Sequence, residues 1–197
     1  MARVSHLLLL FSVLPIAWTA MSAATAPGST TTNFIKASCG TTTNPVVCVQ
    51  SLSPYASEIK QNPLQLAQTA LSVSLARAQS TKTFVSNMKK FKGLKTREYE
   101  AIEDCLDEIG DSVDRLSRSV QELKDIGEAK GQDFVWHMSN VETWVSAALT
   151  DENTCIDGFA GRALDGKIKT SIKARVVNVA QVTSNALALA NHYASKH

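Results

Sequence analysis

The sequence predicts an all-α protein: an antiparallel up-down-up-down four-helix bundle, preceded by a helical hairpin and held by two disulfides. Three observations predict this fold. Apolar residues recur at helical spacing, glycines separate the runs with short loops, and four cysteines lie where such a bundle can pair them. The 197 residues are 44% hydrophobic and 19% charged, which excludes disorder over most of the chain. A formal net charge of +2 argues against a dedicated nucleic-acid-binding protein.

Residues 1–24 are expected to be a secretory signal peptide and not part of the fold. Arg3 precedes an almost unbroken apolar run over residues 7–16, and small residues follow at positions 22–24. This run is shorter than the roughly 20 residues needed to cross a bilayer. We therefore expect cleavage after Ala24, which leaves an exported domain over residues 25–197 with no membrane segment.

A helical hairpin is expected over about residues 31–60. Its two short helical pieces lie around Cys39 and Cys48, and they are interrupted at Pro45 and Pro54 because proline cannot continue a helix interior. No alternating pattern of useful length predicts a strand here or elsewhere in the chain.

Four amphipathic helices are expected to form the bundle over about residues 62–195. The expected starts are Asn62–Pro63, an N-cap followed by proline, and then Thr96, Asp133 and Asp165. The first helix is expected to run to about Lys90, and glycines follow the first three helices at positions 93, 127 and 158. The clearest apolar stripe belongs to the second helix: Ile102, Leu106, Ile109, Val113, Leu116, Val120 and Leu123.

The cysteines provide a test of this topology. In an exported protein, four cysteines most simply form two disulfides. Cys105 and Cys155 are equally distant from residue 130, in the expected loop between the second and third helices. An antiparallel pair of helices therefore places them at one level of the bundle, as a bridge requires. Cys39 and Cys48 are left to close a local loop.

No combination of residues predicts catalysis, a metal site or a cofactor. Residues 161–167 match a nucleotide-binding P-loop up to its last position, but Ile168 stands where a hydroxyl residue is needed and no strand precedes them. His137 has no Glu-x-x-His partner, and the cysteines are expected to be oxidised. We expect no catalytic residue, no bound metal and no cofactor.

One helix face and two tryptophans leave more than one interpretation open. Asp107, Asp111 and Asp114 share a face opposite the apolar stripe because they are spaced at i, i+4 and i+7. This face is either a solvated surface or a docking surface for a basic partner. Trp136 and Trp144 are expected to place at least one ring in the core, although tryptophan is also a favoured interface anchor.

Several segments resemble the plant invertase and pectin methylesterase inhibitor family. They are residues 143–150 (TWVSAALT), 153–159 (NTCIDGF), 104–105 with the acidic residues that follow, 113–116, 39–48 and 184–189. The resemblance covers the whole mature chain. It implies a four-helix bundle with an N-terminal hairpin, with Cys39 paired to Cys48 and Cys105 to Cys155. The second pairing agrees with the equal distance of Cys105 and Cys155 from the loop between their helices.

The resemblance implies an inhibitor and not an enzyme. Some family members cap the pectin-binding cleft of pectin methylesterase as a 1:1 complex, whereas others block invertase, the better-known ones through a Pro-Lys-Phe motif. This sequence lacks that motif, which favours pectin methylesterase as the partner. Acid invertase is the alternative partner, and a cell-wall interaction protein without an enzyme target is the alternative function. The implied location is extracellular, in the plant cell wall or apoplast.

The resemblance also implies the partner-binding residues. The family's acidic positions after the third cysteine correspond to Asp107, Asp111 and Asp114, and its threonine before the fourth cysteine to Thr154. Two departures are Ile109, where inhibitors often carry tyrosine, and the absence of a fifth, free cysteine.

Aspartates lose charge toward pH ~4, which weakens a complex with a basic patch. A group kept protonated would instead favour the complex in acid, and the sequence leaves both directions open.

Overall fold

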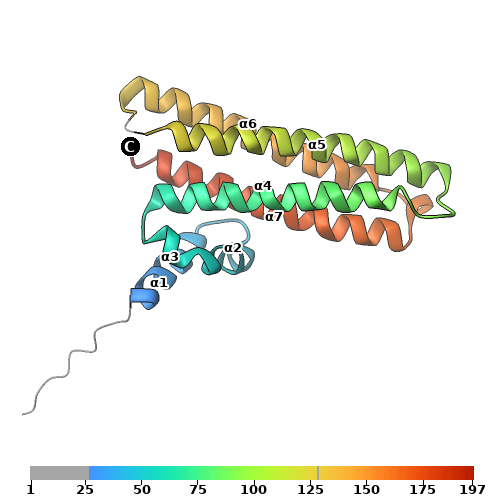
Figure 1. The fold of residues 1–197 in the computed structure, drawn as a ribbon, viewed down its shortest axis with the longest axis horizontal. Coiled ribbons are helices and arrows are strands. Elements are labelled where there is room, and N and C mark those ends of the chain that lie inside the picture. The colour runs from blue at the N-terminus through green and yellow to red at the C-terminus, as the bar shows by residue number, and fades with distance from the viewer. Residues whose placement is uncertain (1–26, 128) are drawn as a thin grey trace, which may run out of the picture.

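Four long helices form the body of the protein in the computed structural model, which describes residues 27–127 and 129–197. They are α4 (Pro63–Met88), α5 (Thr96–Asp125), α6 (Gly131–Gly158) and α7 (Lys167–Ala194). Successive helices run antiparallel, and the described residues contain no strand (Figure 1). The predicted fold class is therefore confirmed. The expected signal peptide lies outside the described residues.

Short local contacts set the ends of α4 and the start of α5. The Asn62 side chain accepts hydrogen bonds from the backbone N–H groups of Leu64 and Gln65, at 2.9 and 3.2 Å, and so caps α4 as predicted. Gly93 turns the chain after α4 with φ +87°, a conformation that favours glycine. An ion pair of 2.6 Å between Lys89 and Glu103 then joins the end of α4 to α5.

The inward face of α5 is the predicted stripe, rotated slightly. Leu106 and Val113 are only half-buried, because the centre of the buried face is shifted toward Cys105, Ser112 and Ser119. The stripe residues that are buried are Ile102, Ile109, Leu116, Val120 and Leu123. Two small hydroxyl side chains therefore occupy core positions of α5.

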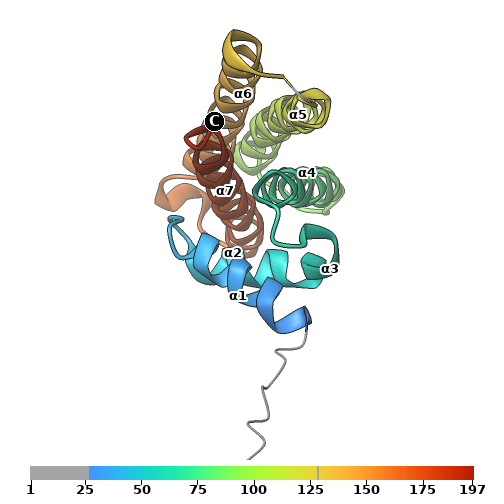
Figure 2. The same cartoon turned by 90° about the vertical axis from the view of Figure 1, so that its left-hand side faces the viewer.

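The N-terminal hairpin lies on one side of the bundle, against α4 and α7 and away from α5 and α6 (Figure 2). It contains α1 (Pro27–Cys39), α2 (Pro45–Leu52), a 3₁₀ turn (Ser53–Tyr55) and α3 (Ala56–Ile59). Pro45 is the first residue of α2 and Pro54 lies in the 3₁₀ turn, so both prolines mark element boundaries. Ile35 and Ile59 are fully buried and anchor the hairpin to the bundle core.

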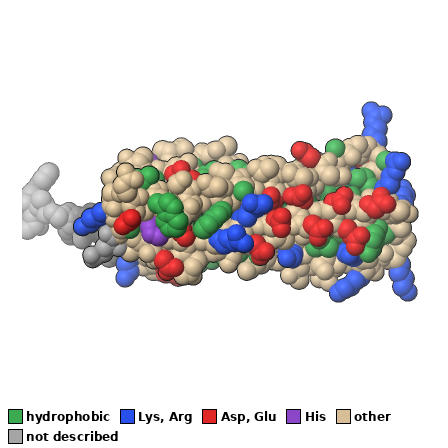
Figure 3. Space-filling model, turned by 90° about the horizontal axis from the view of Figure 1, so that it is seen from above, with side chains coloured by type: hydrophobic (Ala, Val, Ile, Leu, Met, Phe, Trp, Pro, Cys, Tyr) green, Lys and Arg blue, Asp and Glu red, His purple; other side chains and the backbone are tan. Residues whose placement is uncertain are grey.

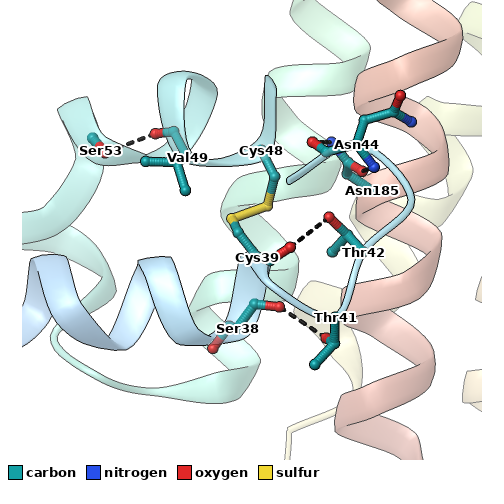
Figure 4. The surroundings of a disulfide bond; sticks show 9 residues. All are labelled: Ser38, Cys39, Thr41, Thr42, Asn44, Cys48, Val49, Ser53 and Asn185. Atoms are coloured by element: carbon teal, nitrogen blue, oxygen red, sulfur yellow. Dashed lines mark hydrogen bonds between the residues drawn. A yellow bond between two sulfur atoms is a disulfide. The ribbon is translucent and has the colours of Figure 1, made fainter. Parts of the chain in front are cut away.

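Both disulfides have the predicted pairing. Cys105 and Cys155 join α5 to α6, with their Cα atoms 4.4 Å apart, and Cys39 and Cys48 close the turn between α1 and α2, with their Cα atoms 5.5 Å apart. The Cys39–Cys48 disulfide lies beside a contact that links the hairpin to α7 (Figure 4). There the Asn185 amide donates to the backbone oxygen of Asn44 and accepts from its N–H, each at 3.0 Å.

Replacing Asn185 by alanine is expected to lower the free energy of unfolding by about 1–3 kcal/mol, because both backbone groups of Asn44 lose their partner in a half-buried position. Only 3% of Asn185 is exposed, so water does not replace the amide freely. Urea unfolding measures the effect. Asn153→Ala, on the exposed side of α6, is the matched control because it makes the same helix-interior change. Equal stability of the two variants contradicts the prediction.

The expectation that at least one of the two tryptophan rings lies in the core is wrong. Neither tryptophan is in the core: Trp136 is 61% exposed and Trp144 is half-buried, because the buried face of α6 is centred on Val141 and Val145 and both rings lie beside it. The P-loop-like residues 161–167 form the turn between α6 and α7, with a 3₁₀ segment (Arg162–Leu164) and no preceding strand.

Candidate functional site

The three predicted aspartates lie together on an exposed face. Figure 3 shows Asp and Glu side chains gathered on the right half of the surface that α5 and α6 form. Next to this surface, between α4 and α5, lies an open groove of about 720 Å³. Asp107, Asp111 and Asp114 line its α5 side, and Lys82, Thr83, Ser86 and Asn87 line its α4 side.

A glycine helps to shape this groove. Gly110 lies in the middle of α5, and a Cβ atom there would come within 3.1 Å of the Lys82 Nζ atom. The Lys82 side chain therefore lies across α5 at this position. Lys82 forms no ion pair with any carboxylate among the described residues. The groove thus carries three carboxylates and one ammonium group, and it is acidic overall.

A second groove of about 410 Å³ lies between α5 and α6, over the Cys105–Cys155 disulfide. Asp107 borders both grooves. Thr154, which lines the second groove, therefore lies on the same continuous surface as Asp111 and Asp114. The Thr154 hydroxyl donates to the backbone oxygen of Thr150 at 3.0 Å, which leaves the hydroxyl oxygen exposed as an acceptor. The structure therefore brings all four predicted residues into one surface. We call it the acidic face: Asp104, Asp107, Glu108, Asp111, Asp114, Thr154 and Asp157.

Beneath the acidic face, Arg115 is held by Asp151. The Arg115 Nε atom lies 2.8 Å from Asp151 Oδ2, and this pair joins α5 to α6. Burial raises the pKa of Asp151, although the charge of Arg115 opposes the shift. Burial also raises the pKa of Glu108, with help from the charges of Asp151 and Asp111. The charge of Arg115 opposes the rise in the Glu108 pKa as well.

One buried carboxyl group was missed by the sequence analysis. Glu152 is 0% exposed, and its Oε1 atom accepts hydrogen bonds from the hydroxyls of Ser112 at 2.7 Å and Thr183 at 2.9 Å. Its Oε2 atom has no partner. Burial raises the Glu152 pKa to about 7, and the two hydroxyl bonds oppose this shift. The available signal was spacing, since Glu152 lies four residues after Ala148 and three before Cys155, both of which are buried on the same side of α6.

The acidic face offers negative charge and hydrogen-bond acceptors to a partner. Among residues 27–127 and 129–197, no group of three His, Cys, Asp or Glu side chains could hold a metal ion. Exposed carboxylates accept hydrogen bonds and pair with cationic side chains. No helix in the described part of the chain is long and apolar enough to cross a membrane.

Comparisons with known proteins agree with the fold. The family model for plant invertase/pectin methylesterase inhibitors matches residues 33–189. The chain is 58% identical over 195 residues to the 21 kDa protein of Daucus carota, covering 99% of this chain and 98% of that one. It is 55% identical over 166 residues to Pectinesterase inhibitor 11 of Arabidopsis thaliana, covering 84% and 82%.

Its fold is similar to the crystal structure of mutant form A of a pectin methylesterase inhibitor from Arabidopsis, with a TM-score of 0.63 and 24% sequence identity. That match covers 78% of this chain and 92% of the other, and it supports the arrangement of the bundle alone. The family match spans most of the sequence, including all four cysteines and the acidic face. The chain therefore belongs to the plant invertase/pectin methylesterase inhibitor family, a family of inhibitors and not of enzymes.

Proposed function

We propose that this protein inhibits pectin methylesterase by binding the enzyme through the acidic face. The observation that carries the proposal is the 55% identity to a relative named as a pectinesterase inhibitor, over 84% of this chain. Identity at that level over most of one domain supports the same fold and the same class of target. The absence of a Pro-Lys-Phe motif from the sequence favours this target over invertase.

The mechanism is reversible occlusion of the substrate-binding cleft in a 1:1 complex. The acidic face offers carboxylates on rigid, packed helices, so little conformational entropy is lost when a partner docks. Those carboxylates are complementary to a partner surface that carries lysine, arginine or exposed N–H groups. Charge complementarity of this kind raises the rate of association and orients the two proteins. Thr154, beside Asp107, supplies a neutral acceptor within the same contact area.

A parallel titration tests this proposal. The oxidised protein from Thr25 onward is added to plant pectin methylesterase and to acid invertase across the mildly acidic range. Loss of methylesterase activity with invertase unaffected supports the proposal. Loss of invertase activity alone contradicts it and assigns the other family activity. If folded, oxidised protein inhibits neither enzyme, an interaction role in the wall without an enzyme target is favoured.

The protein acts outside the cell, in the plant cell wall. The support for this location is the apolar N-terminal segment, with its small residues before Thr25, together with membership of the family. Two disulfides and the absence of free cysteines among the described residues suit an oxidising compartment. N-terminal sequencing of the protein recovered from wall fluid is expected to begin at Thr25, and an intact Met1 there contradicts the proposed cleavage.

A further inference from the structure

The end of the bundle where α4 meets α5 and α6 meets α7 is rich in basic residues. Residues 89–100 contain five Lys or Arg and two Glu, and residues 159–173 contain four Lys or Arg and one Asp. The whole chain has a net charge of only +2. Positive charge is therefore concentrated in these two segments, which we call the basic end.

The two segments of the basic end lie side by side. Leu94 from the first and Phe159 and Leu164 from the second pack into the same hydrophobic cluster. Figure 1 shows both connections at the right-hand end of the bundle, away from the N-terminal hairpin. In Figure 3, Lys and Arg side chains project from this end, just beyond the Asp and Glu side chains of the acidic face.

Most of these cations have no anionic partner. Lys89 pairs with Glu103 and Lys169 with Asp165, which fixes those two side chains. Within the described residues, the others make no ion pair with a carboxylate: Lys90, Lys92, Lys95, Arg97, Arg162, Lys167 and Lys173. Seven unpaired cations on two adjacent connections make a positive field suited to a ligand with several negative charges.

Two exposed aromatic rings lie among these cations. Phe91 is 57% exposed and stands between Lys90 and Lys92, and Tyr99 is 39% exposed with the Lys89 ammonium 5.0 Å from its ring centre. Large exposed aromatics beside charged groups are favoured at binding surfaces, because the ring supplies apolar area while its neighbours supply specificity. The flat C–H faces of sugar rings are suitable partners for such rings.

We propose that the basic end binds a linear polyuronate, a polysaccharide with a carboxylate on successive sugars. The choice of polyanion rests on the proposed function. Hydrolysis of a pectin methyl ester consumes water, releases methanol and a proton, and leaves a carboxylate on the sugar, so the target's product is such a polymer. Several weak ion pairs along one chain add up to useful avidity. The acidic face repels the polymer, which confines it to the basic end and leaves the enzyme-binding surface free.

Binding is measured with the mature, oxidised protein and two soluble probes: polygalacturonate and the same polymer fully methyl-esterified. We expect binding to polygalacturonate that weakens as salt is raised, and no binding to the uncharged ester. The variant Lys92→Gln, Lys95→Gln, Arg97→Gln is expected to bind about tenfold more weakly. Phe91→Ala is expected to weaken binding without changing its salt dependence.

The control variant Lys36→Gln, Lys124→Gln, Lys196→Gln makes the same charge change at the other end of the molecule and is expected to retain wild-type affinity. An equal loss in both triple variants overturns the proposal, because it shows a bulk charge effect. Equal binding of the methyl-esterified polymer, or tighter binding of anionic phospholipid vesicles, also overturns it. Because no enzyme is present, these results do not depend on whether pectin methylesterase is inhibited.

Discussion

The free energy of unfolding is expected to fall by about 3 kcal/mol between pH ~4.5 and pH ~7 because of one buried side chain, Glu152. Its pKa is about 7 in the folded protein, against an ordinary value of 4.5. In this interval the folded state holds a proton that the unfolded state has lost. The stability that Glu152 contributes is therefore complete below pH ~4.5 and is lost as the pH rises to about 7.

The surroundings of Glu152 account for this shift. It lies in the core between α5, α6 and α7, and the groups that touch its carboxyl are the uncharged hydroxyls of Ser112 and Thr183. The charge of Asp151 also raises the Glu152 pKa, and Asp151 is itself paired with Arg115. No cation contacts Glu152 among the described residues, so burial dominates and the neutral form is favoured.

The variant Glu152→Gln isolates this contribution, because glutamine keeps the accepting oxygen and cannot ionise. It places an amide where Oε2 has no partner, so we expect it to be about 1 kcal/mol less stable than the wild type near pH 4.5. Near pH 8 it is expected to be about 2 kcal/mol more stable, because the wild type then carries a buried charge. Urea unfolding at intervals from pH 4.5 to 8 measures both curves, which should cross.

Glu58→Gln is the control for this experiment, since Glu58 is exposed on α3 and the same chemical change there should leave the wild-type pH curve in place. Burial also raises the pKa of Asp151 and Glu108, so part of the wild-type slope remains in Glu152→Gln. Parallel curves for the wild type and Glu152→Gln would show that Glu152 titrates normally. The expected result means that Glu152 stabilises the protein most in acid, the condition of the cell wall where we propose that it acts.

The bundle could be predicted from the sequence because its signals are local. The Asn62–Pro63 start of α4 depends on a cap made within three residues, and the stripe of α5 depends on spacing along one helix. The Cys105–Cys155 pairing needed one further assumption, that neighbouring helices are antiparallel. By contrast, the degree of burial of Leu106 and of Trp144 depends on how far each helix rotates toward its neighbours, which spacing does not determine.

The candidate site could be predicted only in part for the same reason. The shared face of Asp107, Asp111 and Asp114 follows from helix geometry, but the contribution of Lys82 depends on the approach of α4 to α5 at Gly110. The burial of Glu152 could have been predicted from the sequence, because its spacing from Ala148 and Cys155 places it on the buried side of α6. A charged residue at a core position conflicts with the hydrophobic pattern, and the conflict is resolved by hydroxyls on two other helices.

Replacing Asp107, Asp111 and Asp114 together by asparagine is expected to weaken inhibition of pectin methylesterase about a hundredfold. Each partly desolvated ion pair across a protein interface contributes about 1 kcal/mol, and three such losses correspond to that factor. Asparagine keeps the size of each side chain, and all three positions are exposed, so folding is expected to be unaffected. The inhibition constant and the association rate, measured at two ionic strengths, should show that the variant has lost most of the salt dependence.

The matched control is Glu58→Gln, Asp125→Asn, Asp133→Asn, which removes three negative charges at the other end of the molecule and should inhibit like the wild type. Unchanged inhibition by the folded Asp107/Asp111/Asp114 variant contradicts the role of the acidic face.

Lys82→Gln supplies a change of opposite sign within the same groove. Lys82 is the ammonium group that partly neutralises the three aspartates. Its removal is expected to speed association and to strengthen inhibition several-fold, because a basic partner then meets a more negative surface. A bulk charge effect would weaken inhibition equally in the Asp107/Asp111/Asp114 variant and in its matched control. Weaker inhibition in the first of these alone, together with stronger inhibition by Lys82→Gln, therefore assigns recognition to this groove.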